Sequence, residues 1–83
     1  MRVLIVDDEA PARDRLRRLL GAFESVGIAG EARDGDEALA RVAELRPDAL
    51  FLDVQMPGAS GLDVAASLPD PAPAVVFVTA FDR

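Results

Sequence analysis

The sequence predicts an α/β domain with a parallel sheet, because short apolar runs alternate with segments of helical periodicity along its 83 residues. The connections between these segments are short, as βαβ units require, and the chain length fits one small domain. Hydrophobic residues make up 51% of the chain while aromatic residues reach only 5%, so aliphatic side chains must build the core. We therefore expect strands of Val, Leu and Ile covered on both faces by helices.

The first two elements are expected to be a strand over residues 2–7 and a helix that begins near Pro11. Proline is tolerated in a first helical turn, where its missing N–H has no intrahelical partner. Four apolar residues then recur at i, i+3, i+4 and i+7, which predicts one helical face and an end between Gly21 and Glu24. This predicted apolar face consists of Leu16, Leu19, Leu20 and Phe23.

Three further strands are expected over residues 26–32, 48–53 and 75–79. The first of them contains Gly27 and Gly30, which weaken a strand interior, so we place it at the edge of the sheet. The other two are nearly continuous apolar runs, as strands buried on both faces of a parallel sheet usually are.

Two further helices are predicted from their capping residues. Asp34 and Glu37 resemble a capping box in which Asp replaces Ser or Thr, and the helix they open must end before Pro47. Ser60 and Asp63 repeat this spacing at the start of a third helix. The inward-facing residues expected on the second helix are Leu39, Val42 and Ala43, and the third helix is expected over residues 60–68, ended by Pro69, Pro71 and Pro73.

Two of the apolar runs end in carboxylates: the first runs into Asp7 and Asp8, and the third ends in Asp53. The carboxyl ends of parallel strands lie at one edge of a sheet, where open α/β sheets place their ligands, so the three side chains should converge. Carboxylates this close repel one another unless a cation neutralises them, and Mg²⁺ prefers oxygen ligands. Asp7 or Asp8 could instead simply cap the first helix, but two adjacent carboxylates exceed what one cap needs. We therefore favour an acidic metal and phosphoryl site.

Gln55 and Thr79 are further candidate site residues, because they follow the third strand and end the fourth. The sequence Met56-Pro57-Gly58 predicts a turn that directs the Gln55 carbonyl toward Asp53, where a hard cation could bind it. Pro next to Gly also forms ordinary turns, and Thr is a common strand residue, so both residues have a purely structural alternative.

Composition excludes several kinds of chemistry. The chain has no Cys and no His, so disulfides, thiolate metal sites and imidazole catalysis are excluded, and a phosphoryl acceptor must be oxygen-based. The net charge of -6 argues against direct nucleic-acid binding. The apolar runs are too short to span a membrane and no signal-peptide pattern opens the chain, so we expect a cytoplasmic location. One basic cluster is interpreted as a solvated helix face: Arg13, Arg15, Arg17 and Arg18.

Together these motifs resemble the receiver domain of bacterial two-component response regulators. The resemblance extends over the whole chain and is carried by VLIVDDE at residues 3–9, FLDVQMPGASGL at 51–62 and VVFVTAFD at 75–82. The segment ARDRLRRLL at residues 12–20 resembles the subfamily whose receivers precede a LytTR DNA-binding domain. The resemblance implies a doubly wound parallel sheet in a flavodoxin-like receiver fold, with strand order 2-1-3-4 for the strands expected here.

The resemblance also implies a function in phosphorelay signal transduction and transcription regulation. A sensor histidine kinase would donate a phosphoryl group in a Mg²⁺-dependent reaction, and the chain would be a phosphoacceptor instead of a conventional enzyme. The implied roles are Asp53 as phosphoacceptor, Asp8 as direct Mg²⁺ ligand, Asp7 as ligand through water, Gln55 as ligand through its carbonyl and Thr79 as switch hydroxyl.

Residues 1–83 are expected to be the amino-terminal portion of a receiver, because the family pattern continues through a fourth helix, a fifth strand and a fifth helix. The fifth strand of the family carries a phosphate-pairing Lys, whereas the basic residues of this chain are all Arg. An alternative is a truncated receiver that acts as an interaction or dimerisation module without phosphotransfer, in which the strand over residues 75–79 pairs with another copy or another protein. A third hypothesis, a phosphohydrolase using Asp53 and Asp8, would need a second acid or base where Gln55 lies.

Overall fold

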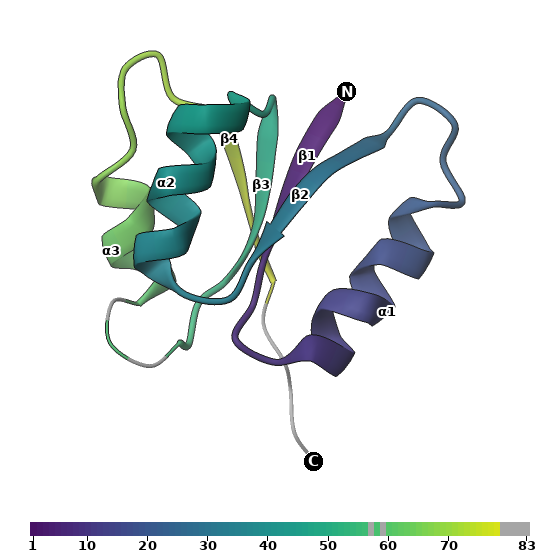
Figure 1. Ribbon diagram of the computed structural model, residues 1–83, viewed down its shortest axis with the longest axis horizontal. Helices are drawn as coiled ribbons and strands as arrows, with labels where there is room; N and C mark the ends of the chain where they lie inside the picture. The colour runs from purple at the N-terminus through teal and green to yellow at the C-terminus, as the bar shows by residue number, and fades with distance from the viewer. Residues whose placement is uncertain (57, 59, 79–83) are drawn as a thin grey trace.

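A parallel sheet lies between two layers of helices in the computed structural model, which describes residues 1–56, 58 and 60–78 (Figure 1). One helix covers one face of the sheet and two helices cover the other, so the predicted doubly wound arrangement is confirmed. The elements alternate along the chain as β1 (Arg2–Val6), α1 (Ala10–Leu20), β2 (Gly27–Ala32), α2 (Gly35–Leu45), β3 (Ala49–Asp53), α3 (Gly61–Ala66) and β4 (Ala74–Val78).

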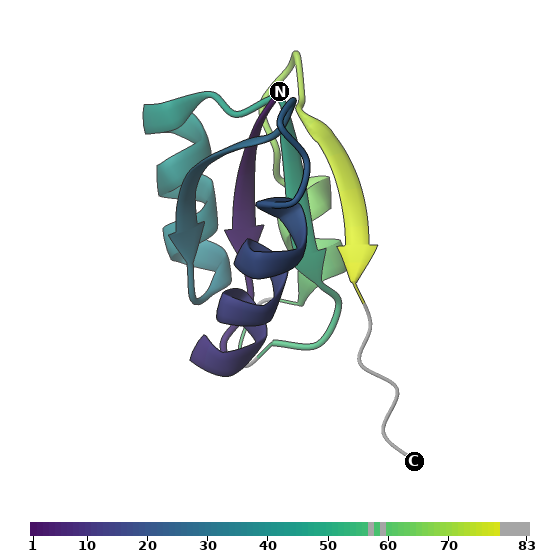
Figure 2. The same ribbon diagram turned by 90° about the vertical axis from the view of Figure 1, so that its right-hand side faces the viewer.

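The strand order is β2-β1-β3-β4 with every pair parallel, as the sequence predicted, and the glycine-containing β2 lies at an edge. Figure 2 shows the strand arrows pointing in one direction, with β4 at the opposite edge. Val6 of β1 pairs with Leu52 of β3, so the residues that follow them, Asp7 and Asp53, emerge side by side. This register brings the acidic ends of the two strands together.

The core has two parts because side chains of a strand alternate between the faces of the sheet. Leu4 and Val6 of β1 pack with Leu50 and Leu52 of β3 in the cluster that α2 and α3 cover. On the other face, Val3 and Ile5 pack beneath α1 with Leu20 and Ala49. The side chains of Val3 to Val6 are fully buried, so β1 is the central strand of both clusters.

The helical face predicted for α1 is only half right. Leu20 is buried and Leu16 packs against the core, whereas Leu19 and Phe23 are each 59% exposed. The helix ends at Leu20, so Phe23 lies beyond it. Leu19 is turned about 60° around the helix axis from Leu16, away from β1 and β2.

The second helix begins as predicted at Asp34, whose side chain accepts a hydrogen bond from the Glu37 N–H at 2.8 Å. The Glu37 carboxylate reaches one residue further back than a standard capping box, to the N–H of Arg33. Val42 is buried as expected, but Ala43 is exposed, and Ala38 occupies the core instead. The third helix has the complete capping box predicted for its first turn, made by Ser60 and Asp63.

Arg2 fastens the amino end of the sheet to the end of α2. Its backbone N–H donates to Asp48 Oδ2 at 2.7 Å, and its Nη1 donates to the Leu45 carbonyl at 2.7 Å. The guanidinium therefore satisfies a carbonyl that the helix end leaves without an intrahelical partner. Among the residues described, none of the helices has the length and apolar character needed to cross a bilayer.

Removing the side chain of Leu50, which is fully buried, should destabilise the fold far more than removing that of Leu62, which is 59% exposed. We expect Leu50→Ala to cost about 2 to 5 kcal/mol through lost burial and a residual cavity. Leu62→Ala should stay within about 0.5 kcal/mol. Urea unfolding of both variants measures the difference, and similar losses for both would contradict the assigned core.

Candidate functional site

Three carboxylates meet at the carboxyl edge of the sheet. Asp7 and Asp8 follow β1 and Asp53 ends β3, and one carboxylate oxygen from each lies within 4.8 Å of the others. The predicted convergence of these residues is thus observed. Asp7 is 8% exposed, and Asp53 is intermediate in burial.

The alternative that these aspartates simply cap the first helix receives no support from α1. Its N-cap residue is Glu9, and no side chain makes a capping hydrogen bond there. Asp7 Oδ1 instead accepts the N–H of Glu9 at 3.0 Å, a bond that shapes the loop before the helix. The Asp7 N–H donates to the carbonyl of Ala32 at 3.1 Å, which extends the β1–β2 contact to the site.

Asp53 is oriented by the turn that follows it. Its Oδ1 accepts a hydrogen bond from the Gln55 N–H at 3.1 Å, so the backbone of Gln55 lies beside the acidic cluster. Metal binding by the Gln55 carbonyl stays a prediction. Thr79, the predicted switch hydroxyl, lies outside the described residues.

Gly61 is a residue that sequence reasoning missed. Its N–H donates to the Val54 carbonyl at 2.9 Å, and a Cβ at this position would overlap the carbonyl oxygen of Asp53. Only glycine lets the first turn of α3 approach the backbone of Asp53 so closely. A glycine directly after the predicted N-cap Ser60 was the available signal, since that position does not favour glycine for helix formation.

The electrostatics of the cluster favour a bound cation. Burial raises the pKa of Asp7 above its ordinary value of 3.8, the Glu9 N–H opposes that rise, and the charges of Asp53 and Asp8 add to it. Within the described ranges, the salt bridges of the arginine side chains are made to Glu31 and Glu44. The negative charges of the three aspartates are therefore not neutralised by a salt bridge among these residues. An all-oxygen site with repelling charges and open coordination toward solvent fits Mg²⁺.

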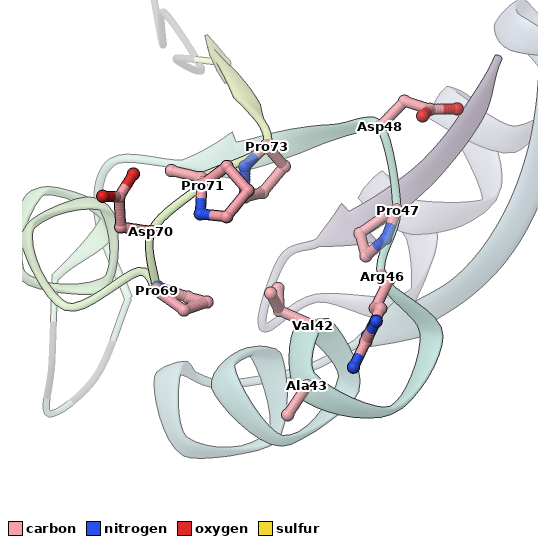
Figure 3. A pocket seen from close by; sticks show the side chains of 10 residues that line it. Val42, Ala43, Arg46, Pro47, Asp48, Pro69, Asp70, Pro71 and Pro73 are labelled. Carbon is pink, nitrogen blue, oxygen red and sulfur yellow. The ribbon is translucent and has the colours of Figure 1, made fainter.

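A separate cavity of about 640 Å³ lies at the opposite, amino edge of the sheet (Figure 3). It lies between the end of α2 and the loop before β4, and its walls include Pro47, Pro69, Pro71 and Pro73. Because β3 and β4 begin beside it, this cavity is a full strand length from the carboxylates and takes no part in their chemistry.

The fold and the acidic cluster together agree with what sequence comparison finds. Residues 3–83 match the family described as the response regulator receiver domain. The chain belongs to this family, whose members are the receiver domains of response regulators in two-component signalling. The predicted family and the predicted fold are both confirmed.

Several named relatives are regulatory proteins. The chain is 51% identical over 84 residues to the transcriptional regulatory protein BtsR of Salmonella typhi. It is 48% identical over 86 residues to the positive alginate biosynthesis regulatory protein of Pseudomonas aeruginosa. Both alignments cover the whole chain but only 35% of the relative, so the chain spans about a third of these proteins.

Solved receiver domains share the architecture. The signal receiver domain of the putative response regulator NarL from Mycobacterium tuberculosis superposes with a TM-score of 0.87 at 37% identity, covering 99% of this chain and 68% of that one. The response regulator domain of Thermotoga maritima CheB gives a TM-score of 0.87 at 34% identity, with 95% and 60% covered.

Replacing Asp7 by Asn should stabilise the chain in the absence of divalent cations. Because the pKa of Asp7 is raised by folding, the native state binds its proton more tightly than the unfolded state, and this contribution to stability is lost as the pH rises above 3.8. Asn cannot ionise, so Asp7→Asn should show higher stability at pH 7, with an advantage that shrinks as the pH falls toward 3.8. Urea unfolding across this range tests the sign, with Asp14→Asn on the exposed side of α1 as the control. Lower stability of Asp7→Asn at pH 7 would contradict the electrostatic argument.

Proposed function

We propose that this chain accepts a phosphoryl group at Asp53 in a Mg²⁺-dependent reaction, as the phosphorylated partner in two-component signalling. The observation that carries the proposal is the meeting of three carboxylates within 4.8 Å at the carboxyl edge of a receiver sheet. Asp53 is the acceptor in this proposal, because it ends the interior strand β3 and the Gln55 N–H orients its carboxylate.

The transfer is a displacement at phosphorus. A carboxylate oxygen of Asp53 forms a new P–O bond, and the bond to the donor breaks with its electron pair leaving on the donor. That donor bond is P–N in a phosphohistidine and P–O in an acyl phosphate. Bound Mg²⁺ would neutralise the charge shared by the acceptor and the phosphoryl oxygens.

The other residues of the site hold the cation and the product. Asp8 is proposed as a direct Mg²⁺ ligand, Asp7 as a ligand through water and the Gln55 carbonyl as a third protein ligand. The low exposure of Asp7 supports its indirect role, since less of its carboxylate faces solvent. Thr79 is proposed to donate a hydrogen bond from its hydroxyl to the aspartyl-phosphate.

The proposed partners follow from the family. A sensor histidine kinase in the cytoplasm is proposed as the phosphoryl donor, and residues 1–83 as the amino-terminal portion of a receiver. The name of the relative BtsR, a transcriptional regulatory protein, supports an output in transcription regulation. We propose a LytTR DNA-binding domain for that output, on the resemblance of the α1 sequence to this subfamily, with no direct nucleic-acid contact by these 83 residues.

Incubation with a small acyl phosphate and Mg²⁺ should add one phosphoryl group to the chain. Asp53→Asn should abolish the adduct because an amide cannot act as the nucleophile. Asp14→Asn, which changes an exposed carboxylate on α1, should label like the original chain. Intact-mass spectrometry measures all three, and an equal adduct on Asp53→Asn would exclude this residue as the acceptor.

Mg²⁺ should raise the melting temperature, because a ligand that binds only the native state adds RT ln(1 + [L]/Kd) to its stability, about 1.4 kcal/mol at ten times Kd. Asp8→Ala should remove most of this shift, since it removes a direct ligand. Asp14→Ala carries the same substitution outside the cluster and should keep the shift. A full shift in Asp8→Ala would mean that Mg²⁺ binds elsewhere.

We also propose that the 83-residue chain self-associates through β4. This strand lies at an edge of the described sheet, and its Val76 and Phe77 are 43% and 42% exposed. Apolar side chains and backbone hydrogen-bonding groups on an edge strand favour pairing with a second copy.

Light scattering should therefore show an average molar mass that increases with the concentration of the protein. Val76→Thr keeps a β-branched residue while removing apolar surface, so it should shift association to higher concentration. Leu19→Ser removes an even more exposed apolar side chain, on α1, and should leave the association unchanged. A monomeric mass at every concentration would overturn the proposal.

A further inference from the structure

Arg13 of α1 joins the acidic site to the edge of the sheet. Its Nη1 donates to the backbone carbonyl of Asp7 at 2.8 Å, and its Nε donates to Glu31 Oε1 of β2 at 3.0 Å. The side chain is only 19% exposed, so it is not the solvated group that the basic cluster of α1 suggested. One guanidinium thus links the β1–α1 loop, α1 and β2.

Arg17, one helical turn later, provides a natural comparison. Its Nε and Nη2 bind the other oxygen of Glu31 at 2.7 and 2.6 Å, with a side chain that is 50% exposed. Both arginines therefore pair with the same carboxylate, but the contact with Asp7 is made by Arg13. Glu31 therefore holds the guanidinium of Arg13 at Nε, while Nη1 of the same group contacts Asp7.

The contact with Asp7 completes a set of bonds around that residue. The Asp7 N–H donates to Ala32, its Oδ1 accepts from Glu9, and its carbonyl accepts from Arg13. The carbonyl of Asp7 belongs to the peptide unit that leads into Asp8, and a peptide unit is planar. Fixing that carbonyl therefore fixes the plane of this peptide unit and with it the positions of the Asp8 N and Cα atoms, from which the Asp8 side chain extends.

The site needs such a restraint because its carboxylates repel one another. Asp7, Asp8 and Asp53 lie within 4.8 Å, and the loop that carries the first two is short. Arg13 restrains this loop through hydrogen bonds to Glu31 and to the backbone carbonyl of Asp7. Because these bonds do not use the carboxylates of Asp7, Asp8 and Asp53, those carboxylates stay available to bind a cation.

We propose that Arg13 is a positioning residue for the cation site, holding the β1–α1 loop so that Asp7 and Asp8 face Asp53 before Mg²⁺ arrives. This inference rests on the proposed function, because it assumes that the three carboxylates bind Mg²⁺. Groups that orient metal ligands in this way commonly contribute about 10- to 100-fold to metal affinity.

The test compares Arg13→Gln with Arg17→Gln in the 83-residue chain, with Mg²⁺ alone as the ligand. Both variants lose an ion pair with Glu31, but only Arg13→Gln loses the contact with Asp7. We expect Arg13→Gln to raise the Kd for Mg²⁺ by about tenfold or more, and Arg17→Gln to stay within about twofold. Titration calorimetry gives the Kd, and the melting temperature without Mg²⁺ separately reports any general loss of stability.

Arg13→Lys keeps the charge but lacks the fork that reaches Glu31 and Asp7 together, so its Kd should lie between those of the original chain and Arg13→Gln. It also provides the measurement if Arg13→Gln does not fold, and an unchanged Kd would then overturn the inference.

A lower melting temperature of Arg13→Gln with an unchanged Kd would assign Arg13 a purely structural role and overturn the inference. The inference would also be overturned if Arg17→Gln weakened Mg²⁺ binding as much as Arg13→Gln does. Absence of Mg²⁺ binding by the original chain would instead overturn the proposed function, and this inference with it.

Discussion

The parallel register between β1 and β3 is the constraint on which the rest of the structure depends. Val6 pairs with Leu52, and both side chains are fully buried in one apolar cluster. A slip of one residue would turn every side chain of β1 to the other face of the sheet, which the two packed faces forbid. Burial of uncharged side chains therefore decides where Asp7 and Asp53 lie. The geometry of the site is set by apolar core residues that do not themselves belong to the site.

Folding concentrates negative charge at one edge, and the protein does not neutralise it with the basic side chains of the described ranges. Arg13 instead restrains the neighbouring backbone through the Asp7 carbonyl, and both Arg13 and Arg17 pair with Glu31 of β2. A site of this kind is less stable when empty than an uncharged one would be, and that difference is available as binding free energy for a cation. At Asp7, burial and the neighbouring charges together raise the pKa. The ionised carboxylate therefore lowers the stability of the empty protein, while the same negative charge favours cation binding.

Most of the fold could be predicted because its signals are local. Alternating apolar runs, the capping residues Asp34 and Ser60 and the glycines of β2 gave the elements, their order and the edge position of β2. The errors arose where packing between elements determines which side chains are buried. Leu19 has the spacing of a core residue, but α1 does not direct it toward the sheet.

The site was predictable to the same extent and for the same reason. The three aspartates follow predictable strands, so their convergence could be deduced from topology. The supporting residues could not be deduced in this way. Gly61 matters because of one backbone approach to Asp53, and Arg13 because its side chain reaches across two elements. For Gly61 the sequence offered only an indirect signal, a glycine directly after the N-cap Ser60, and the reach of Arg13 to Asp7 is not encoded in periodicity.

Arg2 holds the amino end of β1 in place, whereas its contacts do not restrain the carboxyl end of this strand. Its hydrogen bonds to Asp48 and to the Leu45 carbonyl hold the start of β1 against α2 and the residue preceding β3. A charge change at the acidic end therefore cannot be relieved by sliding the whole strand along its neighbour. It must be absorbed as local twist in the last residues of β1 and in the loop beyond, so amide hydrogen exchange should respond to cations near Asp8 and remain constant near Arg2.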